Sequence, residues 1–83
     1  MDAAAAKLTE AVEICEKYPD KLPYIDKKCE LLRCMLHIYY ELQDMTKCRK
    51  LIDMIDSIND KYRELGVSRE VNEEIRKAVI LSK

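Results

Sequence analysis

The 83-residue chain is short of several residue types that particular functions require. It has one glycine, two prolines, no tryptophan and no phenylalanine. A single glycine excludes the Gly-rich loops that cradle phosphate groups, because those loops need several positions without a side chain. It also disfavours a chain of tight β-hairpins, whose turns commonly use glycine. The composition therefore excludes a nucleotide-binding loop and favours a helical protein.

Long apolar runs and an excess of one charge are missing too. No run approaches the ~20 apolar residues that cross a bilayer. Residues 1–7 lack the basic flank and apolar stretch of a secretion signal. Fifteen basic and sixteen acidic residues give a net charge of −1, without the one-signed excess of a nucleic-acid or anionic-membrane surface. We expect a cytoplasmic protein that binds neither nucleic acid nor membrane.

What is present suffices for one small core. Hydrophobic residues make up 48% of the chain, which argues against disorder. Their spacing of three and four predicts a single all-α domain, residues 1–83, with helices over about residues 3–18, 23–43, 45–65 and 69–82. The short connections predict four antiparallel helices, arranged as two stacked helical hairpins or, alternatively, as an up-down four-helix bundle.

A few residues mark where these helices begin and end. Pro19 stops the first helix, and Pro23 suits the first turn of the second, where a missing N–H costs nothing. Gly66 is placed to end the third helix in a left-handed conformation. The polar residues positioned to cap the third and fourth helices are Asp44 or Thr46, and Ser68.

The predicted core follows one apolar stripe on each helix except the second, which has two. A helix apolar over so wide an arc contacts neighbours on two sides, so the second helix is the expected centre of the domain. The stripes comprise Leu8, Ala11, Val12, Cys15 and Tyr18; Ile25, Cys29, Leu32, Leu36 and Tyr39 with Leu31, Cys34, Met35, Ile38 and Leu42; Cys48, Leu51, Ile52, Ile55, Ile58, Tyr62 and Leu65; and Val71, Ile75, Ala78, Val79 and Leu81.

The four cysteines are the most suggestive set of possible ligands. Four thiolates, or three together with His37, would suffice for tetrahedral zinc. No CxxC spacing occurs, however, and each cysteine lies on or near an apolar stripe, where a free thiol packs as a small hydrophobe. We therefore expect core cysteines in a reducing compartment and no metal, with a zinc site or disulfides as the alternatives.

Charged side chains gather on the third helix. A row of aspartates in mid-helix lacks the loop carbonyls that complete a hard-cation site, so we expect a solvated face. Cations at the start of the helix either recognise an acidic partner or are held against Asp53 and nearby glutamates. The aspartates are Asp53, Asp56 and Asp60, and the cations are Lys47, Arg49 and Lys50.

Catalytic groups are scarce. His37 is the sole histidine and has no serine or threonine close to it on its own helix. Cys34 and His37 are spaced to form a nucleophilic pair, but nothing indicates an oxyanion-stabilising loop or a substrate cleft. We expect a non-enzymatic protein without a cofactor.

The stretch from Leu31 to Ile52 resembles the helix–turn–helix of a tetratricopeptide repeat, and the resemblance extends over about residues 31–60. The matching positions are Leu32 at the large aromatic of the first helix, Met35 at the following leucine, Tyr39 at the tyrosine, residues 43–45 at the turn, Cys48 at the small residue of the second helix, and Ile52 at the later aromatic.

The chain also departs from that repeat. Leu36 and Ile55 stand where the repeat has small residues that permit close packing, and Gln43 replaces the turn glycine. Asp60, not proline, lies where the repeat usually ends, and the third helix is predicted to continue to Leu65. The resemblance is therefore to a longer, tetratricopeptide-like unit.

The resemblance implies a protein-interaction scaffold, because the first helices of such repeats line a concave groove that holds a peptide or partner helix. Spacing selects the same five residues, on the face opposite the Ile25–Tyr39 stripe, and Tyr40 is expected to stay largely exposed. Arg33 can pair bidentately with a carboxylate, and Tyr40 offers a stiff contact surface. The predicted groove residues are Glu30, Arg33, His37, Tyr40 and Glu41.

Three other interpretations of this face stay open. The first is a solvated surface on which Arg33, His37 and Glu41 pair with one another at i, i+4 spacing. The second is a self-association face. The third is a structural or redesigned four-helix domain with no ligand, which the Ala-rich start and the near-neutral charge favour.

Overall fold

The fold is all-α, as predicted. The computed structural model describes residues 2–66 and 70–82. Within these ranges it contains four α-helices, a short 3-10 helix and no strand. The elements are α1 (Asp2–Glu16), α2 (Leu22–Glu41), α3 (Met45–Tyr62), η1 (Arg63–Leu65) and α4 (Glu73–Leu81).

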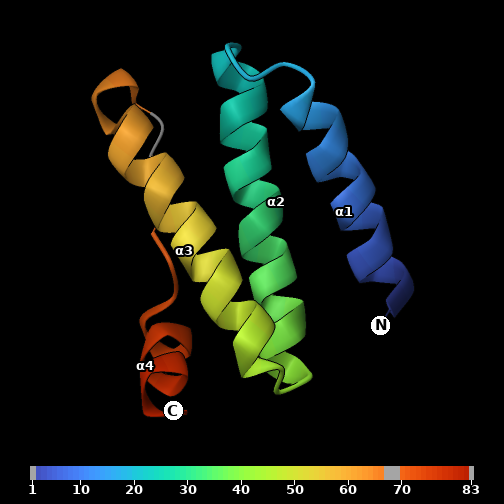
Figure 1. The fold of residues 1–83 in the computed structure, drawn as a ribbon, viewed down its shortest axis with the longest axis vertical. Coiled ribbons are helices and arrows are strands. Elements are labelled where there is room, and N and C mark those ends of the chain that lie inside the picture. Colours follow the sequence, from blue (N-terminus) through green and yellow to red (C-terminus); the bar gives the residue numbers. More distant parts are fainter. Residues whose placement is uncertain (1, 67–69, 83) are drawn as a thin grey trace.

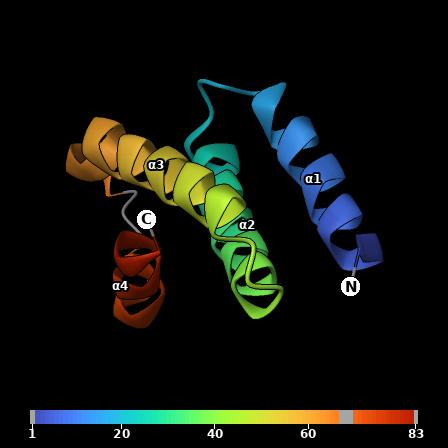
Figure 2. The same cartoon turned by 60° about the horizontal axis from the view of Figure 1, so that its bottom comes forward.

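The helices pack in chain order. The chain runs along α1, returns along α2 and reverses again along α3, and α4 lies against α3 (Figure 1). Both views place α1 and α4 on opposite sides of the α2–α3 pair (Figures 1 and 2). The molecule measures 34 × 29 × 14 Å, so it is a thin slab with α2 and α3 in its middle. Stacked hairpins and an up-down bundle both place chain neighbours side by side, as here.

The prolines delimit the first connection. α1 ends at Glu16, two residues before the predicted end at Tyr18. The reason is Pro19, because a residue that precedes proline avoids helical backbone angles. α2 begins at Leu22, with Pro23 in its first turn as predicted.

The second connection is a tight turn closed by side-chain capping. The Asp44 carboxylate accepts a hydrogen bond from the Lys47 backbone N–H at 3.2 Å, so Asp44, not Thr46, caps α3. Gln43 has a φ of 59°, the left-handed region that favours glycine. α2 therefore ends at Glu41, before the predicted residue 43.

The end of the third helix agrees with its glycine signal, whereas the start of the fourth differs from the prediction. Regular helix stops at Tyr62, and η1 continues the chain to Gly66, whose φ of 86° is left-handed. α4 begins only at Glu73, capped by Asn72, whose side-chain oxygen accepts from the Glu74 N–H at 2.8 Å. The predicted cap Ser68 lies outside the described residues.

Among the described residues sixteen apolar side chains are buried, and fourteen of them form one cluster drawn from all four helices. Most predicted stripe members belong to this cluster or pack against it. α2 lies at its centre, as expected, with two buried sides. The side chains that are buried almost completely are Leu32, Leu36, Ile55, Ile75, Cys29 and Cys48.

Some predicted core positions were wrong. Cys34 is exposed because it lies about 200° around α2 from Leu32, beyond the arc that either neighbouring helix covers. Leu42, Leu65 and Leu81 are exposed because each lies at or beyond the end of its helix, where no neighbour packs. Tyr18 follows the early end of α1 and stacks on Tyr24, with ring centroids 4.4 Å apart.

Two core cysteines use their thiols as weak hydrogen-bond donors. The Cys29 thiol donates to the side-chain oxygen of Asn59 at 3.8 Å, and the Cys48 thiol donates to the backbone carbonyl of Leu36 at 3.9 Å. Asn59 is the buried polar residue that the apolar pattern did not predict. These contacts join α2 to α3 through small side chains.

Candidate interaction groove

The five predicted groove residues lie on one side of α2, and we call them the α2 face. Glu30, His37 and Glu41 are exposed, whereas Arg33 and Tyr40 are half-buried. Tyr40 packs against the core cluster, so the expectation that it is largely exposed was wrong. The α2 face is therefore next to the buried Ile25–Tyr39 stripe at Tyr40, and not strictly opposite to that stripe as predicted.

Part of the α2 face borders a pocket beside α4. This α2–α4 pocket has a volume of about 340 Å³. Two α2-face residues line it, together with residues from the turn, α3 and α4; the lining residues are Tyr40, Glu41, Gln43, Met45 and Ala78. Tertiary packing thus brings the carboxyl end of α2 next to α4, while Glu30, Arg33 and His37 extend the α2 face away from the pocket.

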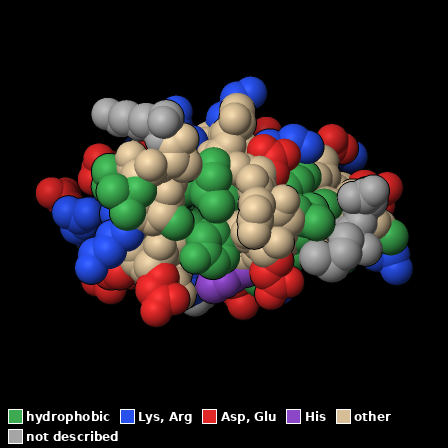
Figure 3. Space-filling view, turned by 90° about the horizontal axis from the view of Figure 1, so that it is seen from below, with side chains coloured by type: hydrophobic (Ala, Val, Ile, Leu, Met, Phe, Trp, Pro, Cys, Tyr) green, Lys and Arg blue, Asp and Glu red, His purple; other side chains and the backbone are tan. Residues whose placement is uncertain are grey.

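The chemical character of this end of the molecule is mixed. Figure 3 shows apolar side chains gathered near its centre, with histidine and acidic side chains along one edge. Such a surface offers both apolar contact area and polar groups that direct a partner. Gln43, Met45 and Ala78 were not among the predicted groove residues. For Gln43 and Met45, the turn predicted at residues 43–45 was the one signal that they would lie beside Tyr40.

The polar side chains of the α2 face have no partners within it. No hydrogen bond or ion pair among the described residues joins Arg33 to Glu41, or His37 to either of them. The interpretation in which these side chains pair at i, i+4 spacing therefore does not describe this structure. Glu30, His37 and Glu41 are exposed, so these three side chains are accessible to a partner.

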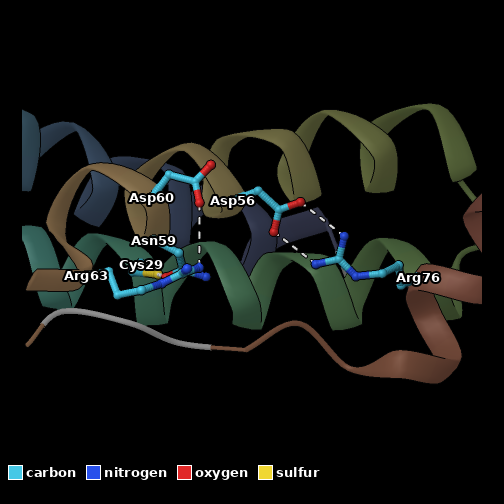
Figure 4. Close-up of polar contacts among 6 residues, drawn as sticks. All are labelled: Cys29, Asp56, Asn59, Asp60, Arg63 and Arg76. Carbon is cyan, nitrogen blue, oxygen red and sulfur yellow. Dashed lines mark hydrogen bonds and ion pairs between the residues drawn. The ribbon is translucent and has the colours of Figure 1, made fainter.

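A bidentate ion pair holds α4 beside this face. The Arg76 guanidinium donates to both carboxylate oxygens of Asp56, at 3.0 and 2.9 Å (Figure 4). These hydrogen bonds raise the pKa of Arg76 above its ordinary value, against the lowering effect of its partial burial. Arg49 donates to the backbone carbonyl of Val79, at 3.5 Å, near the end of α4. Charged groups of α3 thus fix where α4 lies.

The row of aspartates is accordingly not one uniform solvated face. Asp56 binds Arg76 across the α3–α4 seam, whereas Asp60 pairs with Arg63 at 3.5 Å on the exposed surface (Figure 4). Sequence reasoning missed the Asp56–Arg76 pair because the two residues are twenty positions apart and no local spacing relates them.

The cysteines form neither of the alternative sites in the part of the chain that the structure describes. All four are free thiols, and Cys15, Cys29 and Cys48 are buried. No group of three or more His, Cys, Asp or Glu side chains is placed to hold a metal ion among the described residues. Burial, reinforced by the Asp44 carboxylate, raises the pKa of the Cys48 thiol.

Comparison of the chain with protein-family models, with curated proteins and with solved structures finds no match. Within residues 2–66 and 70–82, none of the helices has the length and apolar character needed to span a membrane.

Proposed function

We propose that this chain is a non-enzymatic protein-interaction module whose α2 face and α2–α4 pocket hold a peptide or a partner helix. The observation that carries the proposal is the pairing of a partly apolar pocket with polar side chains that no described residue pairs, on the same side of α2. A binding surface needs both, because apolar burial supplies affinity and unpaired polar groups supply orientation.

Individual residues suit distinct parts of such a contact. Tyr40, rigid and half-buried at the pocket edge, offers contact area at little entropic cost. Arg33 can form a bidentate pair with a partner carboxylate, since it pairs with no carboxylate in residues 2–66 and 70–82. Glu30 and Glu41 lie on either side of Arg33 along α2, and their carboxylates can pair with basic groups of the partner. The proposed partner therefore carries an apolar anchor flanked by charges of both signs.

The chemistry of the side chains supports a binding role over catalysis. His37 is exposed, and no hydrogen bond among the described residues joins it to Cys34 or to a hydroxyl group. A nucleophile needs an adjacent base to activate it. Cys34 and His37 thus lack the hydrogen bond through which the histidine would activate the thiol.

Peptide selection tests the proposal. A displayed library of amphipathic peptides is enriched on the unaltered chain and then measured against an Arg33→Glu/Tyr40→Ala double variant. The matched control is Lys27→Glu/Tyr24→Ala, which makes a charge reversal and a tyrosine truncation on the same helix outside the α2 face. We expect the groove variant to weaken binding by at least about tenfold and the control to leave it unchanged.

Two results would count against the proposal. Equal binding by both variants, with circular dichroism showing that both are folded, removes the α2 face as the binding surface. A homodimer of the unaltered chain that the groove variant alone converts to a monomer, measured by light scattering, assigns this face to self-association instead.

A further inference from the structure

A second groove lies on the α2–α3 seam, and none of its lining residues belongs to the α2 face or the α2–α4 pocket. Its walls are apolar and its only charged groups are two ammonium groups. The lining residues of this lysine-rimmed groove are Met35, Tyr39, Leu51, Met54, Lys47 and Lys50. Its volume is about 200 Å³. Small-molecule sites typically span about 300–1,000 Å³, so the groove suits one or two apolar side chains of a peptide better than a whole small ligand.

The two lysines carry positive charge that no ion pair among the described residues neutralises. No ion pair among the described residues joins Lys47 or Lys50 to a carboxylate, so these lysines are not held against Asp53. The Lys47 ammonium instead lies over the Tyr39 ring, 4.8 Å from the ring centroid. The cation is thereby held at the rim of the apolar wall.

Their position on α3 places them at the positive end of a helix dipole. Lys47 and Lys50 lie near the amino end of α3, where the Asp44 carboxylate caps the helix by accepting from the Lys47 backbone N–H and not from its ammonium group. Arg49, the third cation of the predicted cluster, points elsewhere and binds the Val79 carbonyl of α4. Folding thus divides the basic cluster and leaves two lysines facing one apolar groove.

The floor of the groove suits an inserted apolar side chain. Met35 and Leu51 are buried beneath it, while Met54 is 40% exposed and Tyr39 is half-buried. Methionine side chains adapt to the shape of what they contact, which is why they recur at peptide-binding surfaces. The complement of this surface is an apolar side chain that carries carboxylates on either side.

We propose that the lysine-rimmed groove docks an acidic amphipathic segment of a partner protein, with an apolar residue inserted between Tyr39 and Met54 and carboxylates paired with Lys47 and Lys50. The site is distinct from the α2–α4 pocket, because the two share no lining residue. Its test is therefore independent of that of the α2 face.

The probe is a fluorescein-labelled synthetic helical peptide with leucines at i, i+4 and i+7 and glutamates beside them. Fluorescence anisotropy measures its affinity for the unaltered chain, for Lys47→Gln/Lys50→Gln, and for the control Lys27→Gln/Lys61→Gln. The control removes the same charge, and its Lys61 likewise lies over a tyrosine ring, Tyr62, at 5.4 Å. We expect the groove variant to weaken binding about threefold to tenfold and the control to change it little.

A second peptide, with glutamine in place of every glutamate, separates the charge contribution from apolar contact. We expect it to bind more weakly than the acidic peptide and to be insensitive to Lys47→Gln/Lys50→Gln. Equal losses in the two lysine variants, equal affinity of the two peptides, or no binding near 1 mM would overturn the proposal. So would binding to phosphatidylserine vesicles, but not to peptide, that depends on Lys47 and Lys50.

Discussion

The α3–α4 interface provides the sharpest test of this fold. α4 has nine residues, fewer than the ~12–15 that an isolated helix needs to be even marginally stable in water. It is therefore held by its packing on α3, through Ile75 and the Asp56–Arg76 pair above all. Ile75 is 1% exposed, so Ile75→Ala removes buried methyl and methylene groups and leaves a cavity.

The expected cost of Ile75→Ala is about 2–5 kcal/mol. A domain of this size has a total stability on the order of 4–12 kcal/mol, so the substitution removes much of what holds α4 in place. Because α1, α2 and α3 share most of the core without α4, we expect α4 to undock while the other helices stay folded. Stability should therefore be lost locally before it is lost globally.

Native-state hydrogen exchange measures this directly. Ile75→Ala should speed exchange of the α4 amides by between about 30-fold and several thousand-fold, the equivalent of the cost above. The α2 and α3 amides should stay better protected than the α4 amides, because they exchange only when the rest of the core opens as well. Ile80→Ala, at a site on the same helix that is 58% exposed, is the matched control and should change exchange little.

The contrasting variant is Ile55→Ala, at a fully buried site in α3. It should lower protection in α2, α3 and α4 together, because it lies where these elements share the core. The reasoning fails if the α4 amides of Ile75→Ala are as well protected as those of α2, or if they exchange at the same rate as in the unaltered chain.

Four further predictions concern an ion pair, the backbone and the cysteines. A double-mutant cycle of Asp56→Ala with Arg76→Ala should give a coupling free energy of about 0.5–1 kcal/mol that weakens with salt, since both side chains are about a third or more exposed; zero coupling in urea titrations would contradict the bidentate pair. Gln43→Gly should raise the free energy of unfolding by up to about 1 kcal/mol, because φ at this position is 59°, and a loss of stability would show that the Gln43 side chain contributes instead. In the folded chain Ellman's reagent should modify Cys34 first, and a uniform rate at all four thiols would contradict the burial pattern. Because the folded-state pKa of Cys48 is raised above its ordinary value of 9.0, stability should be constant below about pH 9 and fall by up to about 1.4 kcal/mol per pH unit from there to the folded-state pKa; Cys48→Ala should flatten this slope.

The helices were predictable because their signals are local. Pro19 disfavours helix in the residue before it whatever the rest of the chain does, and Gly66 adopts a left-handed conformation that other residues adopt at a cost. The capping residue of α4 was not predictable in the same way, because Ser68 and Asn72 are both good caps and local preference does not choose between them.

The core was predictable as a set of stripes but not residue by residue. Periodicity tells which side chains share a face, as with Leu32 and Leu36, and both are buried. It does not tell how far around the helix its neighbours reach, so Cys34 was assigned to the core and is exposed. Asn59 is buried because Cys29 of another helix supplies a partner for it, and that partnership has no trace in the spacing of α3.

The candidate sites also have one part that the sequence predicts and one part that depends on how the helices pack. Spacing along α2 alone was enough to group Arg33, Tyr40 and Glu41 on one side of a helix, because a helix repeats every 3.6 residues. That Ala78 completes a pocket with Tyr40, and that Lys47 faces Tyr39 while Arg49 turns to α4, depended on how the helices pack.

The sequence by itself therefore determined four helices, their approximate limits and the polar face of the second, since backbone angles and helical periodicity act over a few residues. Only the tertiary structure decided which of those faces are covered, which charges are paired and where grooves open. These properties depend on contacts between different helices, such as Asp56 of α3 with Arg76 of α4, and no local signal specifies them.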